Sequence, residues 1–100
     1  MREAVIVSTA RTPLAKSHRG EFNVTPGAQL AAFSISAAVQ RAGIDPALIE
    51  DVVLGCGYPE GTTGRNIGRQ AAVRAGLPIS VGGTVVNRFC ASGLQAIAFA

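Results

Sequence analysis

The sequence has no tryptophan, one histidine and only two cysteines among its 100 residues. Two cysteines are too few for a disulfide framework, and Cys56 and Cys90 do not form a C-x-x-C pair. This scarcity excludes a small secreted domain held together by disulfides, and we expect a reducing compartment, the cytoplasm. No cluster of possible ligands indicates a metal ion, and no metal site is predicted.

The chain also lacks a run of basic residues. Nine arginines and lysines against six acidic residues give a net charge of +3, but they are spread along the chain, and only 5% of the residues are aromatic. Nucleic-acid-binding proteins usually concentrate basic residues in a patch interleaved with aromatic side chains. We therefore expect no nucleic-acid partner. The net charge agrees with a mild attraction for an anionic substrate such as a phosphorylated cofactor.

Signatures of membrane insertion, export and nucleotide binding are missing as well. No stretch approaches the roughly 18 uninterrupted apolar residues that a membrane span needs, so no span is expected. The N-terminus lacks the charged and then apolar order of a signal peptide. No Walker-type phosphate loop exists. Gly55 and Gly57 miss the dinucleotide fingerprint because Glu60 occupies the position of its third glycine.

What the chain does have is an alternation of β-branched apolar runs and helical stripes. The predicted strands cover residues 4–9, 51–56 and 84–87. The predicted helices cover residues 26–42, 46–50, 65–75 and 91–100. Thr25 is the expected N-cap of the first helix, with Pro26 at its first position and Gly43 at its end, and Asp45 with Pro46 gives the same start signal for the next helix. The β-α-β-α-β-α order predicts an α/β fold, with a mostly parallel sheet and helices on both faces.

The last segment of the sequence predicts a chain that is a piece of a larger protein. From Phe89 onward no residue is charged, and the final helix shows no capping signal before Ala100. A helix that is apolar on every side belongs in the interior of a larger body. The apolar share of 48% is also more than a domain of this size can readily bury. We therefore expect the fold to be incomplete.

Cys90 stands between the predicted strand 84–87 and the start of the last predicted helix. The first turn of a helix presents unpaired N–H groups and a partial positive charge, which favour a thiolate over a thiol. The same N–H groups can bind a developing oxyanion, and Ser92 and Gly93 keep the following turn slim. Cys90 is therefore a candidate nucleophile for thioester exchange. The alternative is a small buried apolar residue, the common role of a free cysteine.

Residues 86–96 (VNRFCASGLQA) closely resemble the nucleophile segment of thiolases. In that segment Asn, a basic residue, any residue and Cys are followed by a small residue, Ser, Gly and Leu. Three other blocks resemble the family in the same order and spacing, namely RTP at 11–13, DVVLG at 51–55 and RQAAVRAGLP at 69–78. The resemblance extends over essentially the whole chain.

This resemblance implies the N-terminal part of a thiolase-like fold, in which two similar α/β halves form a layered core. Residues 1–100 would be a portion of the first half, and the rest of the enzyme is not present in this chain. The resemblance implies that Cys90 is acylated by a 3-ketoacyl thioester, with its backbone N–H as an oxyanion donor. A His and a second Cys from the C-terminal half would act as base and acid. His18 does not match that histidine and is expected to be a solvated loop residue.

The same resemblance implies that coenzyme A is a substrate and not a bound cofactor, and that the enzyme is a homodimer or homotetramer. Cys56 ends a predicted strand and is expected to be a packing residue. Asn87 and Arg88 fit the motif and are expected to brace the turn. Arg65 and Asn66 open a helix beside a glycine-rich loop, where similar enzymes have a subunit interface, so they are candidates for a substrate or partner contact.

The leading interpretation is an acyl-CoA thiolase of fatty-acid metabolism. It would cleave a 3-ketoacyl-CoA to acetyl-CoA and a shortened acyl-CoA, or run the reverse Claisen condensation. The CASG sequence at 90–93 and the PEG loop at 59–61 resemble the degradative type more than the biosynthetic type. One alternative is a ketoacyl-synthase-type condensing enzyme. The flanking Asn87 and Arg88 and the RTP block disfavour this alternative. The other is a truncated, non-catalytic module that only assembles with other subunits.

Overall fold

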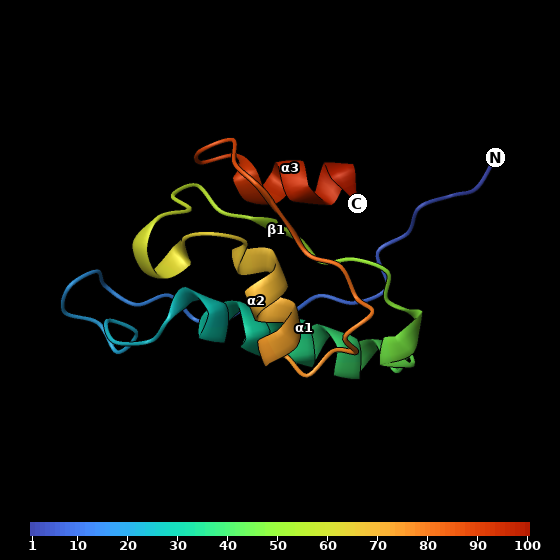
Figure 1. The fold of residues 1–100 in the computed structure, drawn as a ribbon, viewed down its shortest axis with the longest axis horizontal. Helices are drawn as coiled ribbons and strands as arrows, with labels where there is room; N and C mark the ends of the chain where they lie inside the picture. The colour runs from blue at the N-terminus through green and yellow to red at the C-terminus, as the bar shows by residue number, and fades with distance from the viewer.

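A computed structural model describes residues 1–100 of the chain as three α-helices, two short strands and two 3-10 turns. In chain order the elements are α1 (Gly27–Ala42), η1 (Pro46–Leu48), β1 (Val53–Gly55), η2 (Gly61–Thr63), α2 (Ile67–Arg74), β2 (Thr84–Val86) and α3 (Ser92–Phe99). Helices and strands alternate from α1 to α3 (Figure 1). The predicted α/β class is confirmed.

The two strands form a parallel pair at the centre of the molecule. Val53 lies opposite Thr84 and Gly55 lies opposite Val86 in the register. One backbone hydrogen bond extends the pairing beyond β1, from the Cys56 N–H to the Val86 carbonyl over 3.0 Å. Because parallel strands require a crossover connection, α2 lies between β1 and β2 in the chain.

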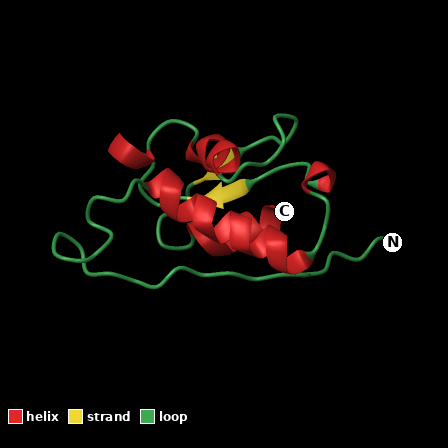
Figure 2. Ribbon diagram, turned by 90° about the horizontal axis from the view of Figure 1, so that it is seen from below, coloured by secondary structure: helices red, strands yellow, loops and turns green.

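Helices cover both faces of this strand pair, as predicted. Helix α3 lies on one side of β1, and α2 lies on the other with α1 beyond it (Figure 1). Seen from below, the two strands lie near the centre of the molecule with helices around them (Figure 2). The order of layers is therefore α3, the strands, α2 and α1. None of the helices combines the length and apolar character that a membrane crossing requires.

Small side chains allow α1 and α2 to pack closely, and they form most of the core. The buried apolar residues of the chain are Ala28, Ala32, Ile67, Ala71, Ala72, Val81 and Ala96. Gly68 brings α2 equally close to the sheet, because a Cβ at this position would overlap the backbone of Thr84. The core is thus built on close backbone approach more than on large side chains.

Residues 4–9 do not form the predicted strand. They make no backbone-to-backbone hydrogen bond, and Val5, Ile6 and Val7 are between 70% and 74% exposed. The segment is held at its end by the Arg41 guanidinium, which donates to the Thr9 carbonyl over 2.8 Å. A strand exists only where its backbone pairs with a neighbour, and β1 and β2 pair only with each other here. The element order therefore begins with α1.

Several predicted element ends are confirmed, and one is wrong. Gly43 closes α1 in the left-handed conformation with φ of 66°, and the Asp45 side chain caps η1 by accepting from the Ala47 N–H over 3.0 Å. Thr25 is not the N-cap of α1. Pro26 holds that position without a side-chain cap, and the helix begins at Gly27. The strands are shorter than predicted because the paired register covers only Val53–Gly55 and Thr84–Val86.

Helix α3 leaves most of its apolar surface uncovered in this chain. Only Ser92 and Ala96 of α3 are buried, whereas Leu94, Ile97 and Phe99 are between 64% and 74% exposed. Ile97 and Ala100 line a cavity of about 420 Å³ together with residues 4–6, and every lining residue is apolar. Exposed apolar surface of this kind is typical of an interface.

Candidate functional site

Cys90 lies in the turn that connects β2 to α3. The helix begins at Ser92 with Ala91 as its N-cap, so Cys90 precedes the cap by one residue and its thiol side chain is exposed. The sequence placed Cys90 between strand and helix, which is confirmed. The side chain is exposed in this chain and not buried, which favours the nucleophile over the small buried apolar residue.

The residue before Cys90 has an unusual backbone conformation. Phe89 has φ of 46°, in the left-handed region that residues with a Cβ rarely adopt, at a cost of about 1–2 kcal/mol. The Asn87 side chain supports this conformation, because its Oδ1 accepts a hydrogen bond from the Phe89 N–H over 2.9 Å. The prediction that Asn87 braces the turn is confirmed. Such conformations cluster at functional sites, since only strong local support maintains them.

A second set of hydrogen bonds ties the turn to the first residues of α3. The Ser92 hydroxyl donates to the Phe89 carbonyl over 2.6 Å and accepts from the Arg88 N–H over 2.8 Å. The Arg88 guanidinium donates to Gln95 Oε1 over 2.6 Å. Arg88 therefore also braces the turn, as predicted, and connects it to the second turn of the helix.

Two glycines at the end of β1 allow the turn to lie directly against that strand. A Cβ at Gly55 would overlap the backbone of Ser92, and a Cβ at Gly57 would lie 2.8 Å from the Phe89 carbonyl oxygen. Neither glycine was predicted to belong to the site. The available signal was the pair of glycines flanking Cys56 where a buried strand ends.

Backbone donors remain unpaired around the thiol. The N–H groups of Cys90, Gly93 and Leu94 make no hydrogen bond to the rest of the chain. Unpaired N–H groups at the beginning of a helix can bind an anion. The surface beside them is open, because a Cβ at Gly93 would meet no atom within 4 Å. An exposed sulfur beside unpaired donors is suited to acyl transfer through an oxyanion.

The other candidates from the sequence lie elsewhere or have structural roles. Cys56 is half-buried at the end of β1, in agreement with a packing role. Asn66 caps α2 by accepting from the Arg69 N–H over 3.0 Å, and its Nδ2 donates to the Gly83 carbonyl over 2.7 Å. Arg65 is exposed with φ of 59°. His18 is exposed and lines a separate cavity formed by residues 15–18, Phe22, Asn23, Tyr58 and Thr62.

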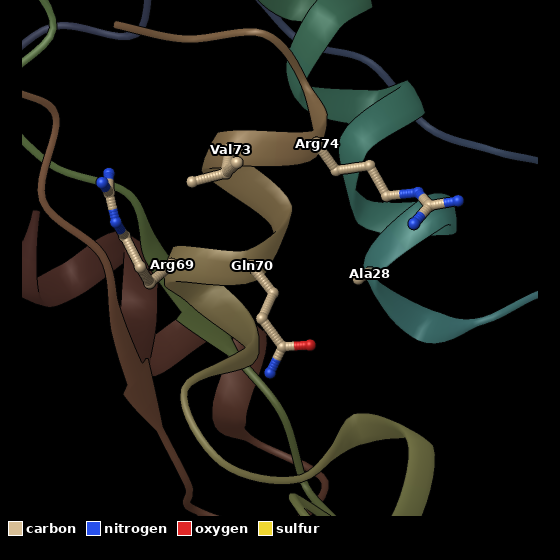
Figure 3. A pocket seen from close by; sticks show the side chains of 5 residues that line it. All are labelled: Ala28, Arg69, Gln70, Val73 and Arg74. Atoms are coloured by element: carbon tan, nitrogen blue, oxygen red, sulfur yellow. The ribbon is translucent and has the colours of Figure 1, made fainter. Parts of the chain in front are cut away.

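A concave region between α1 and α2 is lined by Ala28, Gln70, Val73 and two arginines. Figure 3 shows Arg69 and Arg74 pointing to opposite sides of α2. Arg69 donates to the carbonyls of Ile79 and Val81, and Arg74 donates to the Gln29 side chain. Because both guanidinium groups bind groups of the chain itself, this region is a packing feature and not a converging anion site.

Comparison with known proteins finds a family match over almost the whole chain. The family model described as "Thiolase, N-terminal domain" matches residues 4–100. The chain is 43% identical to a 3-ketoacyl-CoA thiolase of Bacillus subtilis, over 100% of this chain and 26% of that protein. It is 42% identical to an acetyl-CoA acetyltransferase of Paracoccus denitrificans, over 100% of this chain and 25% of that protein. The chain thus spans about a quarter of the length of these relatives.

Proposed function

The chain belongs to the thiolase family, and we propose that it supplies the acyl-accepting cysteine of an acyl-CoA thiolase. The observation that carries this proposal is the exposed Cys90 thiol in a braced turn, beside backbone N–H groups that have no partner in the chain. In this proposal residues 1–100 form a portion of the N-terminal α/β half of the enzyme, and the remainder completes the active site.

The proposed reaction has two steps. The Cys90 thiolate attacks the 3-keto carbonyl of a 3-ketoacyl-CoA, and the Cys90 N–H donates to the oxyanion that forms. The bond between C2 and C3 then breaks, acetyl-CoA leaves as its enolate and takes up a proton, and an acyl-cysteine thioester remains. In the second step the thiolate of free coenzyme A attacks this thioester and releases the shortened acyl-CoA and the Cys90 thiolate.

The proton transfers need groups that this chain does not provide close to Cys90. The only histidine, His18, lines a different cavity, and Cys56 lies half-buried at the end of β1. The resemblance to thiolases implies that a His and a second Cys of the C-terminal half act as base and acid, and we adopt this in the proposal. Coenzyme A acts as a substrate in this proposal, a homodimer or homotetramer is the assembly, and the cytoplasm is the compartment.

Acyl-CoA chemistry is also what the names of the relatives describe. One is a 3-ketoacyl-CoA thiolase, and another, from Escherichia coli K12, is a 3-oxoadipyl-CoA/3-oxo-5,6-dehydrosuberyl-CoA thiolase that is 42% identical over 100% of this chain and 25% of its own length. These names favour a thiolase over the ketoacyl-synthase alternative. We propose thiolytic cleavage of a 3-ketoacyl-CoA as the direction, because the CASG sequence resembles the degradative type.

One observation favours a second candidate function, a non-catalytic assembly module. The exposed apolar residues Leu94, Ile97 and Phe99 offer a docking surface for another polypeptide. The two functions differ in covalent chemistry. Incubating the intact protein with acetyl-CoA should place an acetyl group on the peptide that contains Cys90, as measured by mass spectrometry, and a Cys56→Ser variant should acquire the same label. An assembly module would acquire none.

A further inference from the structure

The Ser92 side chain lies beneath the turn that carries Cys90. Ser92 is only 3% exposed, so its hydroxyl is shielded from water and forms hydrogen bonds only with groups of the chain. It donates to the Phe89 carbonyl over 2.6 Å and accepts from the Arg88 N–H over 2.8 Å. One buried hydroxyl thus connects the Asn87–Arg88 and Phe89–Cys90 peptide groups, on either side of the peptide group between them.

The geometry of the peptide bond makes one of these contacts important for Cys90. The Phe89 carbonyl and the Cys90 N–H belong to the same planar, trans peptide unit, so they point in opposite directions. The Phe89 carbonyl accepts from the Ser92 hydroxyl over 2.6 Å and from the Ser92 backbone N–H over 3.1 Å, and the shorter bond of the hydroxyl helps to hold the carbonyl toward the buried side of the turn. The Cys90 N–H is thereby directed away from the core, where it has no partner within the chain.

We propose that Ser92 is a positioning residue for acyl transfer, whose hydroxyl orients the Phe89–Cys90 peptide group so that the Cys90 N–H faces the substrate oxyanion. This inference rests on the proposed thiolase function. Ser92 touches neither the reacting atoms nor the substrate in this mechanism, because its hydroxyl is occupied on both sides. It acts by fixing the orientation of the Phe89–Cys90 peptide plane. A purely structural role, in which the buried Ser92 side chain only fills space, would need its volume and not its hydrogen bonds.

The test compares acyl transfer with alkylation in the intact protein. Ser92→Ala removes the hydroxyl and leaves the Cβ in place. We expect kcat for thiolysis to fall about ten- to hundredfold while KM changes little, since a misdirected oxyanion donor affects the transition state. Alkylation of Cys90 by iodoacetamide should keep its rate within about twofold, because displacement at carbon forms no oxyanion. Ser92→Thr, which retains a hydroxyl, should recover most of the lost kcat.

Ser36→Ala is the matched control, because it removes a hydroxyl bond to the Ala75 carbonyl far from the turn; its kcat should equal that of the wild type. An unchanged kcat in folded Ser92→Ala, with only a lower Tm, would overturn the inference. Should Ser92→Ala fail to fold, Ser92→Cys, a near-isosteric weak donor, replaces it, and again an unchanged kcat overturns the inference. Cys90→Ser is measured in parallel. If it retains thiolysis, the proposed function itself is wrong, independent of Ser92.

Discussion

The Phe89 carbonyl oxygen lies so close to Gly57 that a Cβ at position 57 would stand only 2.8 Å from it. No side chain fits between the end of β1 and the turn before Cys90. The left-handed Phe89 and the hydrogen bonds of Ser92 therefore depend on a glycine in a distant part of the sequence. The candidate nucleophile is held from two directions, by its own helix and by the neighbouring strand.

Gly57→Ala should consequently destabilise the protein by about 1–3 kcal/mol, because overpacking against a backbone carbonyl forces the turn to move. Urea unfolding of the intact protein measures this effect. Gly93→Ala is the matched control. A Cβ at Gly93 meets no atom within 4 Å, and alanine is favoured over glycine in a helix. Equal loss of stability in both variants would contradict the packing described for Gly57.

The two cysteines should react at different rates with iodoacetamide in the intact protein at neutral pH. The Cys90 side chain is exposed and stands beside unpaired N–H groups, whereas Cys56 is half-buried at the end of a strand. Mass spectrometry of a time course should show the label on Cys90 first. Preferential labelling of Cys56 would show that the accessible thiol has been assigned to the wrong residue.

The isolated 100-residue chain should behave as an aggregating or molten species. Leu94, Ile97 and Phe99 on α3, together with Val5 and Ile6, present apolar side chains to solvent. Such a surface favours association and leaves little to support a cooperative core. Binding of a hydrophobic dye and a broad thermal transition are expected. A monodisperse monomer with a sharp transition would refute this prediction.

Local patterns predicted the elements whose formation depends on nearby residues. Gly43 ends α1 because a left-handed residue terminates a helix, and Asp45 caps the following turn through its own side chain. The strand predicted for residues 4–9 does not form. Their β-branched composition suits a strand, but pairing is a property of the partner, and no partner backbone is adjacent in this chain.

Only part of the site could be predicted from the sequence. The position of Cys90 between a strand and a helix follows from residues that are close in sequence, and so does the support from Asn87. The roles of Gly57 and of the Ser92 hydroxyl do not follow from sequence. They depend on the close packing of β1 against the turn before Cys90, and on the orientation of the Phe89–Cys90 peptide plane.

The most direct measurement of the central claim is thiolysis by the Cys90→Ser variant of the intact protein. The substitution is nearly isosteric at an exposed position, so the variant should fold normally. A serine hydroxyl is a weak nucleophile without an adjacent base, and the rate should fall by about three orders of magnitude or more. Cys56→Ser should retain wild-type activity. Substantial thiolysis by Cys90→Ser would contradict the assignment of Cys90 as the acyl acceptor.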